Sequence, residues 1–184
     1  MNRSGMQGLS LIELMITIAV LSIALGTAQA HFTNIIEARR VSGAADALQT
    51  ALNFARSESI KQMMPMVVTY SMNATTTWSA GIRDNTACAP NLQDPTHANA
   101  CSIPNGADRV LKVFGHDQFP GITARSNRPF TRFEPMRATA IGTNATVSFS
   151  SSMGKEVRVI VGNIGRVRTC SPSGTAKVSG YAPC

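Results

Sequence analysis

The feature that most constrains this chain is a long N-terminal stretch that nothing in the sequence interrupts. From Leu9 to Ala30 it reads LSLIELMITIAVLSIALGTAQA, and Glu13 is its single charged residue. A helix of this length is about 33 Å long, which matches the apolar core of a bilayer. Proline is absent from residues 9–64. We therefore expect a long N-terminal helix that is apolar on all sides in its first half.

Two interpretations of the apolar segment compete: a secretory signal peptide cleaved after Ala30, or a membrane helix that the mature protein keeps. Glu13 disfavours the signal peptide, because the apolar part of a signal peptide rarely holds a carboxylate. Beyond Ala30, small and apolar residues recur at three- and four-residue steps, which predicts an amphipathic continuation of the same helix. The members of this stripe are Ile35, Ala38, Val41, Ala45, Leu48, Leu52, Ala55 and Ser59. We predict one helix from about Leu9 to Gln62, ended by Met64-Pro65.

The net charge of +7 is concentrated in the last third of the 184 residues. Residues 121–184 hold nine basic and two acidic side chains, whereas residues 1–120 hold eight of each kind. This asymmetry indicates either a polyanionic partner or a solvated basic face that keeps the domain soluble.

Sequence patterns of common enzymes and metal sites are missing. The chain has no C-x-x-C, G-x-S-x-G, H-E-x-x-H or P-loop pattern, and these patterns mark many zinc, hydrolase and nucleotide sites. The three histidines, His31, His97 and His116, are far apart in the sequence. We expect no catalysis, no cofactor and no metal.

The segment Gly8-Leu9-Ser10-Leu11-Ile12-Glu13-Leu14 resembles the prepilin motif of type IV pilins and type II secretion pseudopilins. The resemblance implies that a prepilin peptidase cleaves after Gly8 and methylates the new N-terminus at Leu9. It also implies that Glu13 neutralises the N-terminal amine of a neighbouring subunit during assembly. Leu9 departs from the family, which usually has Phe or Met at this position. A carboxylate inside a membrane segment is costly without such a partner.

The resemblance also implies a domain organisation. Residues 1–8 would be the leader, 9–36 a transmembrane and filament-core helix, and 37–63 its amphipathic second half. Residues 64–184 would form a periplasmic β domain with a disulfide-closed tail. The protein would be a single-pass protein of the bacterial inner membrane that later enters a pilus or pseudopilus.

The remaining sequence predicts an α+β fold, in which the helix packs on an antiparallel β-sheet. Strands are predicted at Met66–Tyr70, Trp78–Ile82, Val110–Phe114, Ala145–Ser150, Glu156–Val161 and Arg166–Cys170. Residues 84–108 are predicted to be a loop, and residues 125–137 form an arginine-rich stretch.

The four cysteines form two close pairs in the sequence, Cys88 with Cys101 and Cys170 with Cys184. Disulfides persist in the oxidising compartment outside the inner membrane. Sequential pairing would close two loops, each stabilising the fold by about 3 kcal/mol in the chain-entropy model. Three connectivities are possible, and one disulfide with two free thiols is a further alternative.

The C-terminal segment Gly165-Arg166-Val167-Arg168-Thr169-Cys170, with Val157–Val161 before it, resembles the GspH/FimT family of minor pilins and pseudopilins. Some members of that family bind DNA for natural transformation through this motif, and others prime the filament. Residues two apart on a strand share a face, so Arg166 and Arg168 are predicted to form a short basic row. Arg158 and Lys177 are predicted to extend it.

Arginine rows suit phosphates, and the alternative is a solvated or subunit-facing surface. Phe130 and Phe133 are the only stacking candidates beside basic residues, so any DNA binding should be independent of base sequence and sensitive to salt.

The resemblance implies a minor pilin or pseudopilin processed by prepilin peptidase. It would assemble with other major and minor pilins or pseudopilins, as a tip or priming subunit of a type IV pilus or type II secretion pseudopilus. The alternative is a DNA-binding minor pilin, and a role as the bulk subunit of the filament is less consistent with the disulfide loops.

Overall fold

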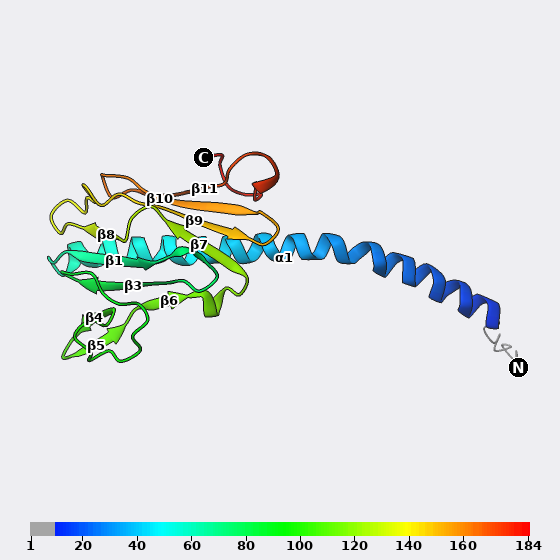
Figure 1. The fold of residues 1–184 in the computed structure, drawn as a ribbon, viewed down its shortest axis with the longest axis horizontal. Helices are drawn as coiled ribbons and strands as arrows, with labels where there is room; N and C mark the ends of the chain where they lie inside the picture. Colours follow the sequence, from blue (N-terminus) through cyan, green and yellow to red (C-terminus); the bar gives the residue numbers. More distant parts are fainter. Residues whose placement is uncertain (1–9) are drawn as a thin grey trace, which may run out of the picture. The chain divides into compact units, whose positions relative to one another are not determined.

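The structure, a computed structural model, describes residues 10–184 apart from the side chains of residues 27–31. The chain divides into two compact units, Met1–Ile36 and Glu37–Cys184. Helix α1, Leu11–Lys61, contributes to both units (Figure 1). The continuous helix predicted from the missing prolines is confirmed, and it ends one residue before the predicted Gln62.

In the first unit, α1 exposes the large apolar side chains of its described residues. Leu11, Ile16, Leu21 and Ile23 are each more than half exposed. Among the described residues, no helix combines the length and the apolarity that a membrane span requires. The transmembrane segment predicted for residues 9–36 stays a prediction.

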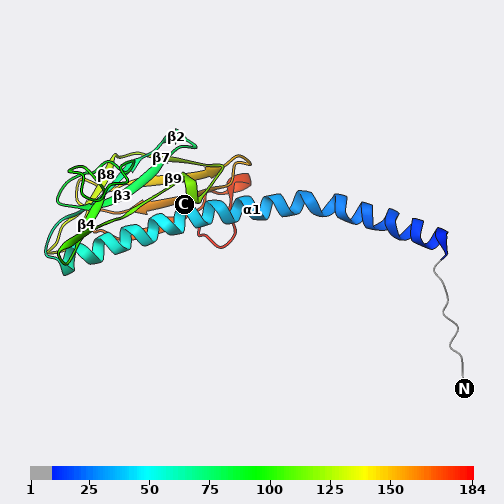
Figure 2. The same ribbon diagram turned by 90° about the horizontal axis from the view of Figure 1, so that it is seen from below.

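In the second unit, one face of α1 is buried against β-strands that all lie on one side of it (Figure 2). Val41, Ala45, Leu48, Leu52 and Ala55 are fully buried, as the predicted stripe requires. Burial was predicted only from Val41 to Ala55, and Ile35, at the start of the stripe, is 54% exposed.

The β domain contains two main antiparallel sheets rather than the single sheet predicted. One has the strand order β6-β3-β1-β8 and the other β11-β10-β9-β7-β2. The bounds of the first sheet are β1 Met66–Ser71, β3 Ser79–Asp84, β6 Val113–Gly115 and β8 Phe130–Phe133. Those of the second are β2 Asn73–Thr75, β7 Ile122–Ser126, β9 Thr146–Ser151, β10 Glu156–Val161 and β11 Val167–Cys170.

Two regions outside the predicted strands also contain strands. The predicted loop 84–108 holds β4, Ser102–Asn105, which pairs with β5, Asp108–Leu111, as a separate ribbon. The arginine-rich stretch 125–137 contains the end of β7 and all of β8. In β8, Thr131 and Phe133 point into the core, and Phe130 and Arg132, which alternate with them, are only half-buried. Buried and half-buried residues therefore alternate in β8, as they do in a strand with one face in the core, although the charge of the stretch did not indicate a strand.

The core joins the two sheets through aromatic rings. Trp78, just before β3, stacks on Phe119 at 6.2 Å between ring centroids. It also meets Phe149 of β9 edge-on at 5.1 Å. Its indole N–H donates a 2.9 Å hydrogen bond to the Ile122 carbonyl oxygen. Such a buried, fully paired indole fixes the packing of one sheet against the other.

Candidate functional site

The assembly motif begins at the first turn of α1. Gly8 and Leu9, the predicted cleavage and methylation residues, lie outside the described residues. Glu13 is exposed, and its backbone N–H approaches the Ser10 side-chain oxygen at 3.3 Å and the Ser10 carbonyl oxygen at 3.1 Å. Ser10 therefore caps the helix that carries Glu13. The Ser-x-x-Glu pattern before an apolar run is a capping signature, and this signal in the sequence could have revealed the cap.

The basic motif lies at the turn between β10 and β11. The Gly162 N–H donates to the Arg166 carbonyl oxygen at 3.0 Å, and the Gly165 N–H donates to the Gly162 carbonyl oxygen at 2.9 Å. Gly165 has a φ of 75°, and a β-carbon there would overlap the Ala138 carbonyl oxygen. The position thus requires glycine for two reasons, a left-handed backbone and a close approach.

Arg166 and Arg168 are both exposed and flank the half-buried Val167, which packs against the core. Among the described residues, neither arginine has a carboxylate within ion-pair distance. Their guanidinium groups are therefore available to an anion.

Arg158 lies on the same face, because its β10 position is paired with Cys170 and the Ile160 position is paired with Arg168. Arg158 is thus the diagonal neighbour of Arg168, a separation of about 7–8 Å. Its Nε is 2.6 Å from the Glu156 carboxylate. The pairing of β10 with β11 thus places Arg158 beside Arg168. The ion pair with Glu156, however, compensates the charge of Arg158.

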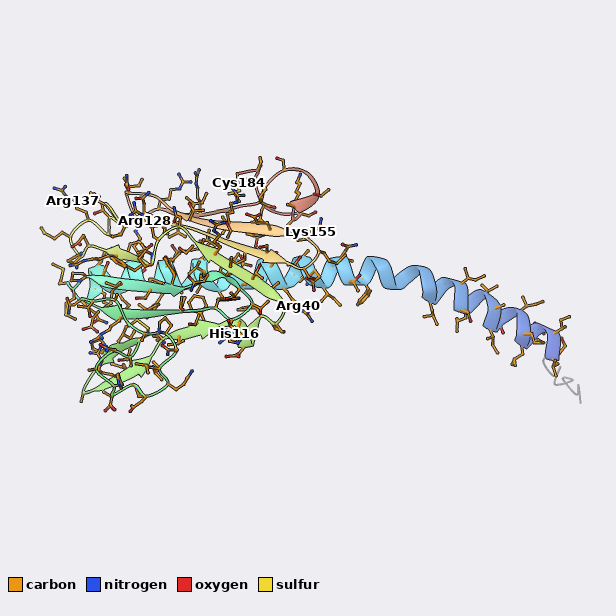
Figure 3. All side chains as sticks on the ribbon, in the orientation of Figure 1. Arg40, His116, Arg128, Arg137, Lys155 and Cys184 are labelled. Carbon is orange, nitrogen blue, oxygen red and sulfur yellow. A yellow bond between two sulfur atoms is a disulfide. The ribbon has the colours of Figure 1, made fainter. Side chains whose placement is uncertain are left out.

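Lys177 lies elsewhere. Its carbonyl oxygen accepts a 3.1 Å hydrogen bond from the Lys155 ammonium group, which precedes β10. Arg168 pairs with Ile160, five residues from Lys155, or about 16 Å along an extended strand. Figure 3 shows Lys155 at the end of the β domain opposite Arg137. The residue after Lys177, Val178, donates a 2.9 Å hydrogen bond from its N–H to the Ser171 Oγ, so Lys177 lies beside the end of β11, three residues beyond Arg168 rather than next to it.

The predicted stacking residues are not available to bases. Phe133 is fully buried and Phe130 is half-buried. Arg132, between them, pairs with Glu134 at 3.0 Å. The two stacking candidates therefore offer little accessible ring surface, because β8 packs Phe133 in the core and half-buries Phe130.

The cysteines pair sequentially, Cys88 with Cys101 and Cys170 with Cys184, which is one of the three connectivities that the sequence leaves open. The second disulfide anchors a tail whose Cys184 N–H donates to the Ser171 carbonyl oxygen at 3.3 Å. Ser171 also forms a β-bridge with Pro183.

Tyr181 in this tail donates a 3.0 Å hydrogen bond from its hydroxyl to the Asp46 carboxylate on α1. Partial burial, with the Asp46 carboxylate nearby, raises the pKa of the Tyr181 phenol. The tail is therefore held at both the sheet and the helix.

Several loops of the β domain lie near the end of α1 (Figure 1). The Ala140 N–H donates to the Asn163 carbonyl oxygen at 2.9 Å, so the loop after β8 adjoins the β10–β11 turn. That turn reaches α1, because a β-carbon at Gly165 would lie 3.5 Å from the Arg56 Nε. We call the large exposed side chains of this region the apolar end surface: Ile60, Met63, Met136, Ile141 and Ile164.

Metal chemistry has no visible site in the part of the chain that the structure describes. No group of three or more His, Cys, Asp or Glu side chains there is placed to hold a metal ion.

The chain matches a family model. Residues 44–165 match the model described as "Type II transport protein GspH". The chain belongs to the GspH family. Residues 3–28 of this GspH-family chain also match the prokaryotic N-terminal methylation motif. It is therefore a minor pilin or pseudopilin that carries a prepilin processing motif.

Solved structures of a pilin are also similar to this GspH-family chain. Two crystal structures of the type IV minor pilin FimU from Pseudomonas aeruginosa each match it at 16% identity and a TM-score of 0.45. The matches cover 78% and 76% of this chain and 95% and 98% of the FimU chains. No curated protein sequence matches the chain.

The family defines the class of function. Proteins of the GspH family are structural subunits rather than enzymes, are processed by prepilin peptidase and assemble with other pilins. Membership implies residence in the inner membrane before incorporation into the filament.

Proposed function

We propose that this GspH-family protein acts as a tip or priming subunit of a type IV pilus or type II secretion pseudopilus. The apolar end surface carries the proposal. Of the seven large apolar side chains exposed among the described residues of Glu37–Cys184, five lie on this surface. Contiguous apolar side chains on a soluble domain mark a protein contact site. A second pilin subunit seated on this end would cover them.

Polar substitutions on this surface test the proposal. The double variant Ile141→Asn/Ile164→Asn changes side chains that are 71% and 69% exposed, so the domain should still fold. We expect fewer assembled filaments per cell by electron microscopy, at an unchanged cellular level of the protein. Met153→Asn, at the β9–β10 turn away from this surface, is the matched control and should assemble normally. Equal filament numbers in all strains would refute a priming role through this surface.

We further propose that cleavage between Gly8 and Leu9 creates an N-terminal amine that pairs with Glu13 of a neighbouring subunit. The exposure of Glu13 in the first turn supports this role, because a carboxylate in an apolar environment needs a partner. Glu13→Gln should be cleaved and methylated, as mass spectrometry can establish, yet remain in the membrane fraction. Gly8→Val should keep the leader. Glu37→Gln, which alters a carboxylate paired with Arg40, is the control. Normal incorporation of Glu13→Gln into sheared filaments would remove Glu13 from assembly.

A second candidate function is sequence-independent DNA binding through the β10–β11 hairpin. The exposure of Arg166 and Arg168 without carboxylate partners favours it. Full-length protein in non-ionic detergent would be titrated with duplex DNA at several salt concentrations. Arg166→Ala/Arg168→Ala should lose most of the affinity, and the slope of log K against log salt should fall by about 1.8.

The matched control is Arg39→Ala/Arg40→Ala, which removes the same charge from two exposed arginines of α1. If both double variants lose affinity equally, only net charge matters and the hairpin is not the site. If the unmodified protein does not bind DNA at low salt, the basic row is a solvated or subunit-facing surface.

A further inference from the structure

The five-stranded sheet aligns a further arginine with the basic hairpin. On β7 the Arg125 position pairs with Ser148 of β9, and the Ser148 position pairs with Arg158 of β10. Directly paired residues of antiparallel strands project from the same face. Arg125, Ser148 and Arg158 therefore form one row across three neighbouring strands. The row crosses the strands, so no local sequence pattern could reveal it.

This row faces away from the core. On β7, β9 and β10, residues alternate between the core and the outer face, and the Arg125 row belongs to the outer set. Arg125 is exposed, and none of the described carboxylates forms an ion pair with it. Arg158, in contrast, is compensated by Glu156. Arg125 is thus an uncompensated positive charge on this face.

A shallow cleft of about 540 Å³ follows the row. Its polar lining combines two guanidinium groups, four hydroxyl groups and an amide, from Arg125, Arg158, Thr123, Thr146, Ser148, Ser150 and Asn127. It also contains one carboxylate, that of Glu156, whose charge is paired with Arg158, so Arg125 remains the uncompensated charge of the cleft. Hydroxyl, amide and guanidinium groups all donate hydrogen bonds to phosphate oxygens. The lining contains no aromatic ring, so it offers no platform for a base. The chemistry of the cleft suits a phosphodiester backbone rather than bases.

The dimensions also suit a duplex. The strand order β11-β10-β9-β7 places Arg168 and Arg125 three strand spacings apart (Figure 1). At about 4.8 Å for each spacing this is about 14 Å. One DNA strand places a phosphate every 3.4 Å along the helix axis while it winds around the duplex, so the span is long enough to meet more than one phosphate of the same strand.

We propose that Arg125 is a phosphate-binding residue of this protein, and that the basic site extends from the β11 arginines across the outer face of the sheet to β7. The inference rests on the proposed DNA binding and assigns it a second contact region. Binding stays independent of base sequence, because every group involved meets the backbone. Arg128, two residues beyond β7, is exposed and extends the same positive potential.

The test uses full-length protein in non-ionic detergent and a short duplex without a recognition sequence. Affinity would be measured between about 50 and 200 mM KCl for the unmodified protein, Arg125→Ala, Arg125→Lys, Arg166→Ala/Arg168→Ala and Arg39→Ala. Arg39→Ala is the control, since it removes one exposed arginine of α1. We expect Arg125→Ala to weaken binding about 5- to 10-fold at the lower salt and to reduce the salt slope by about 0.9. Arg125→Lys should keep the slope.

The outcomes separate this inference from the function on which it rests. If Arg125→Ala behaves like Arg39→Ala while the hairpin double variant loses affinity, DNA binding stands and the role of Arg125 is overturned. If the unmodified protein does not bind the duplex, both fall. The emission of Trp78, the only tryptophan of the chain, verifies that each variant is folded.

Discussion

The Tyr70 hydroxyl donates a 2.9 Å hydrogen bond to the Thr131 hydroxyl, and both side chains are buried between β1 and β8. This bond joins strands that are 61 residues apart in the sequence. Burial raises the pKa of the Tyr70 phenol, and the hydrogen bond to Thr131 only partly opposes the shift. The pair therefore makes the stability of the β domain depend on pH.

Tyr70→Phe should change that dependence. At about pH 7 the free energy of unfolding of the variant should be about 1 kcal/mol lower, because the Thr131 hydroxyl then lies buried without its partner. Above the ordinary tyrosine pKa of 10.0 the unfolded chain releases the proton and the folded chain retains it, so the unmodified domain loses stability as the pH rises. The loss reaches about 1.4 kcal/mol for each pH unit. Near pH 11 the variant should therefore be at least as stable as the unmodified protein.

Urea unfolding of the unit Glu37–Cys184, followed by Trp78 fluorescence, measures this crossover. The unit contains every buried side chain of the described residues. Tyr181→Phe, which alters a partly exposed tyrosine, is the control and should shift the profile less. Parallel pH profiles for Tyr70→Phe and the unmodified unit would contradict the assignment.

Gly165→Ala should destabilise the domain more than Gly106→Ala. Both glycines have a positive φ, 75° and 65°, so each alanine carries the cost of a left-handed backbone, about 1–2 kcal/mol. Only at Gly165 would the new methyl group overlap a backbone oxygen, and Gly106 has open space around it. The overlap should add about 1–3 kcal/mol, measured as the difference in free energy of unfolding. Equal values would mean that the loop of Ala138 moves aside freely.

The two disulfides should differ in their contribution. Their loops have sequence separations of 13 and 14 residues, so the chain-entropy model assigns each about 3 kcal/mol. Cys101, however, is fully buried and Cys184 is exposed. Cys88→Ser/Cys101→Ser should therefore cost more than Cys170→Ser/Cys184→Ser, since it leaves a hydroxyl group in the core. Urea midpoints of the two double variants provide the comparison, and a reversed order would contradict this reasoning.

Leu48→Ala should lower the free energy of unfolding by about 2–5 kcal/mol, because Leu48 is fully buried between α1 and the sheets. Ile60→Ala, on the same helix but 51% exposed, should change it much less. Similar losses at both positions would show that the apolar end surface also stabilises the isolated domain. Thermal unfolding of the unit Glu37–Cys184 distinguishes these results.

The sequence predicted the parts of the fold that depend on local patterns. Helix α1 followed from the spacing of Val41, Leu48 and Ala55, and the β9–β10 hairpin from two alternating strands around Gly154. β4 escaped prediction because it contains Pro104, which is unusual inside a strand. β8 was not predicted because the stretch was interpreted by its charge, and the alternation of Thr131 and Phe133 was not used.

The candidate site was predictable to the same extent. The common face of Arg166 and Arg168 follows from the period of a strand. The alignment of Arg125 with Arg158 depends on how β7, β9 and β10 pair, and this register is set by the packing of their inner faces. The position of Lys177 could not be predicted for a similar reason, because the disulfide and the hydrogen bonds to Lys155 and Ser171 decide where the tail lies.

The tail that ends at Cys184 has a consequence for aggregation between neighbouring domains. Strand β11 is an edge of its sheet, and an open edge can pair with the edge of any neighbouring domain. This edge has only four residues, carries Arg168 and continues into Ser171, whose backbone groups are occupied by Ala182 and Cys184. A short edge strand, a charged side chain on it and a tethered segment that covers its end each prevent sheets from pairing edge to edge. A β domain packed beside many similar domains would thus be protected from strand-to-strand aggregation.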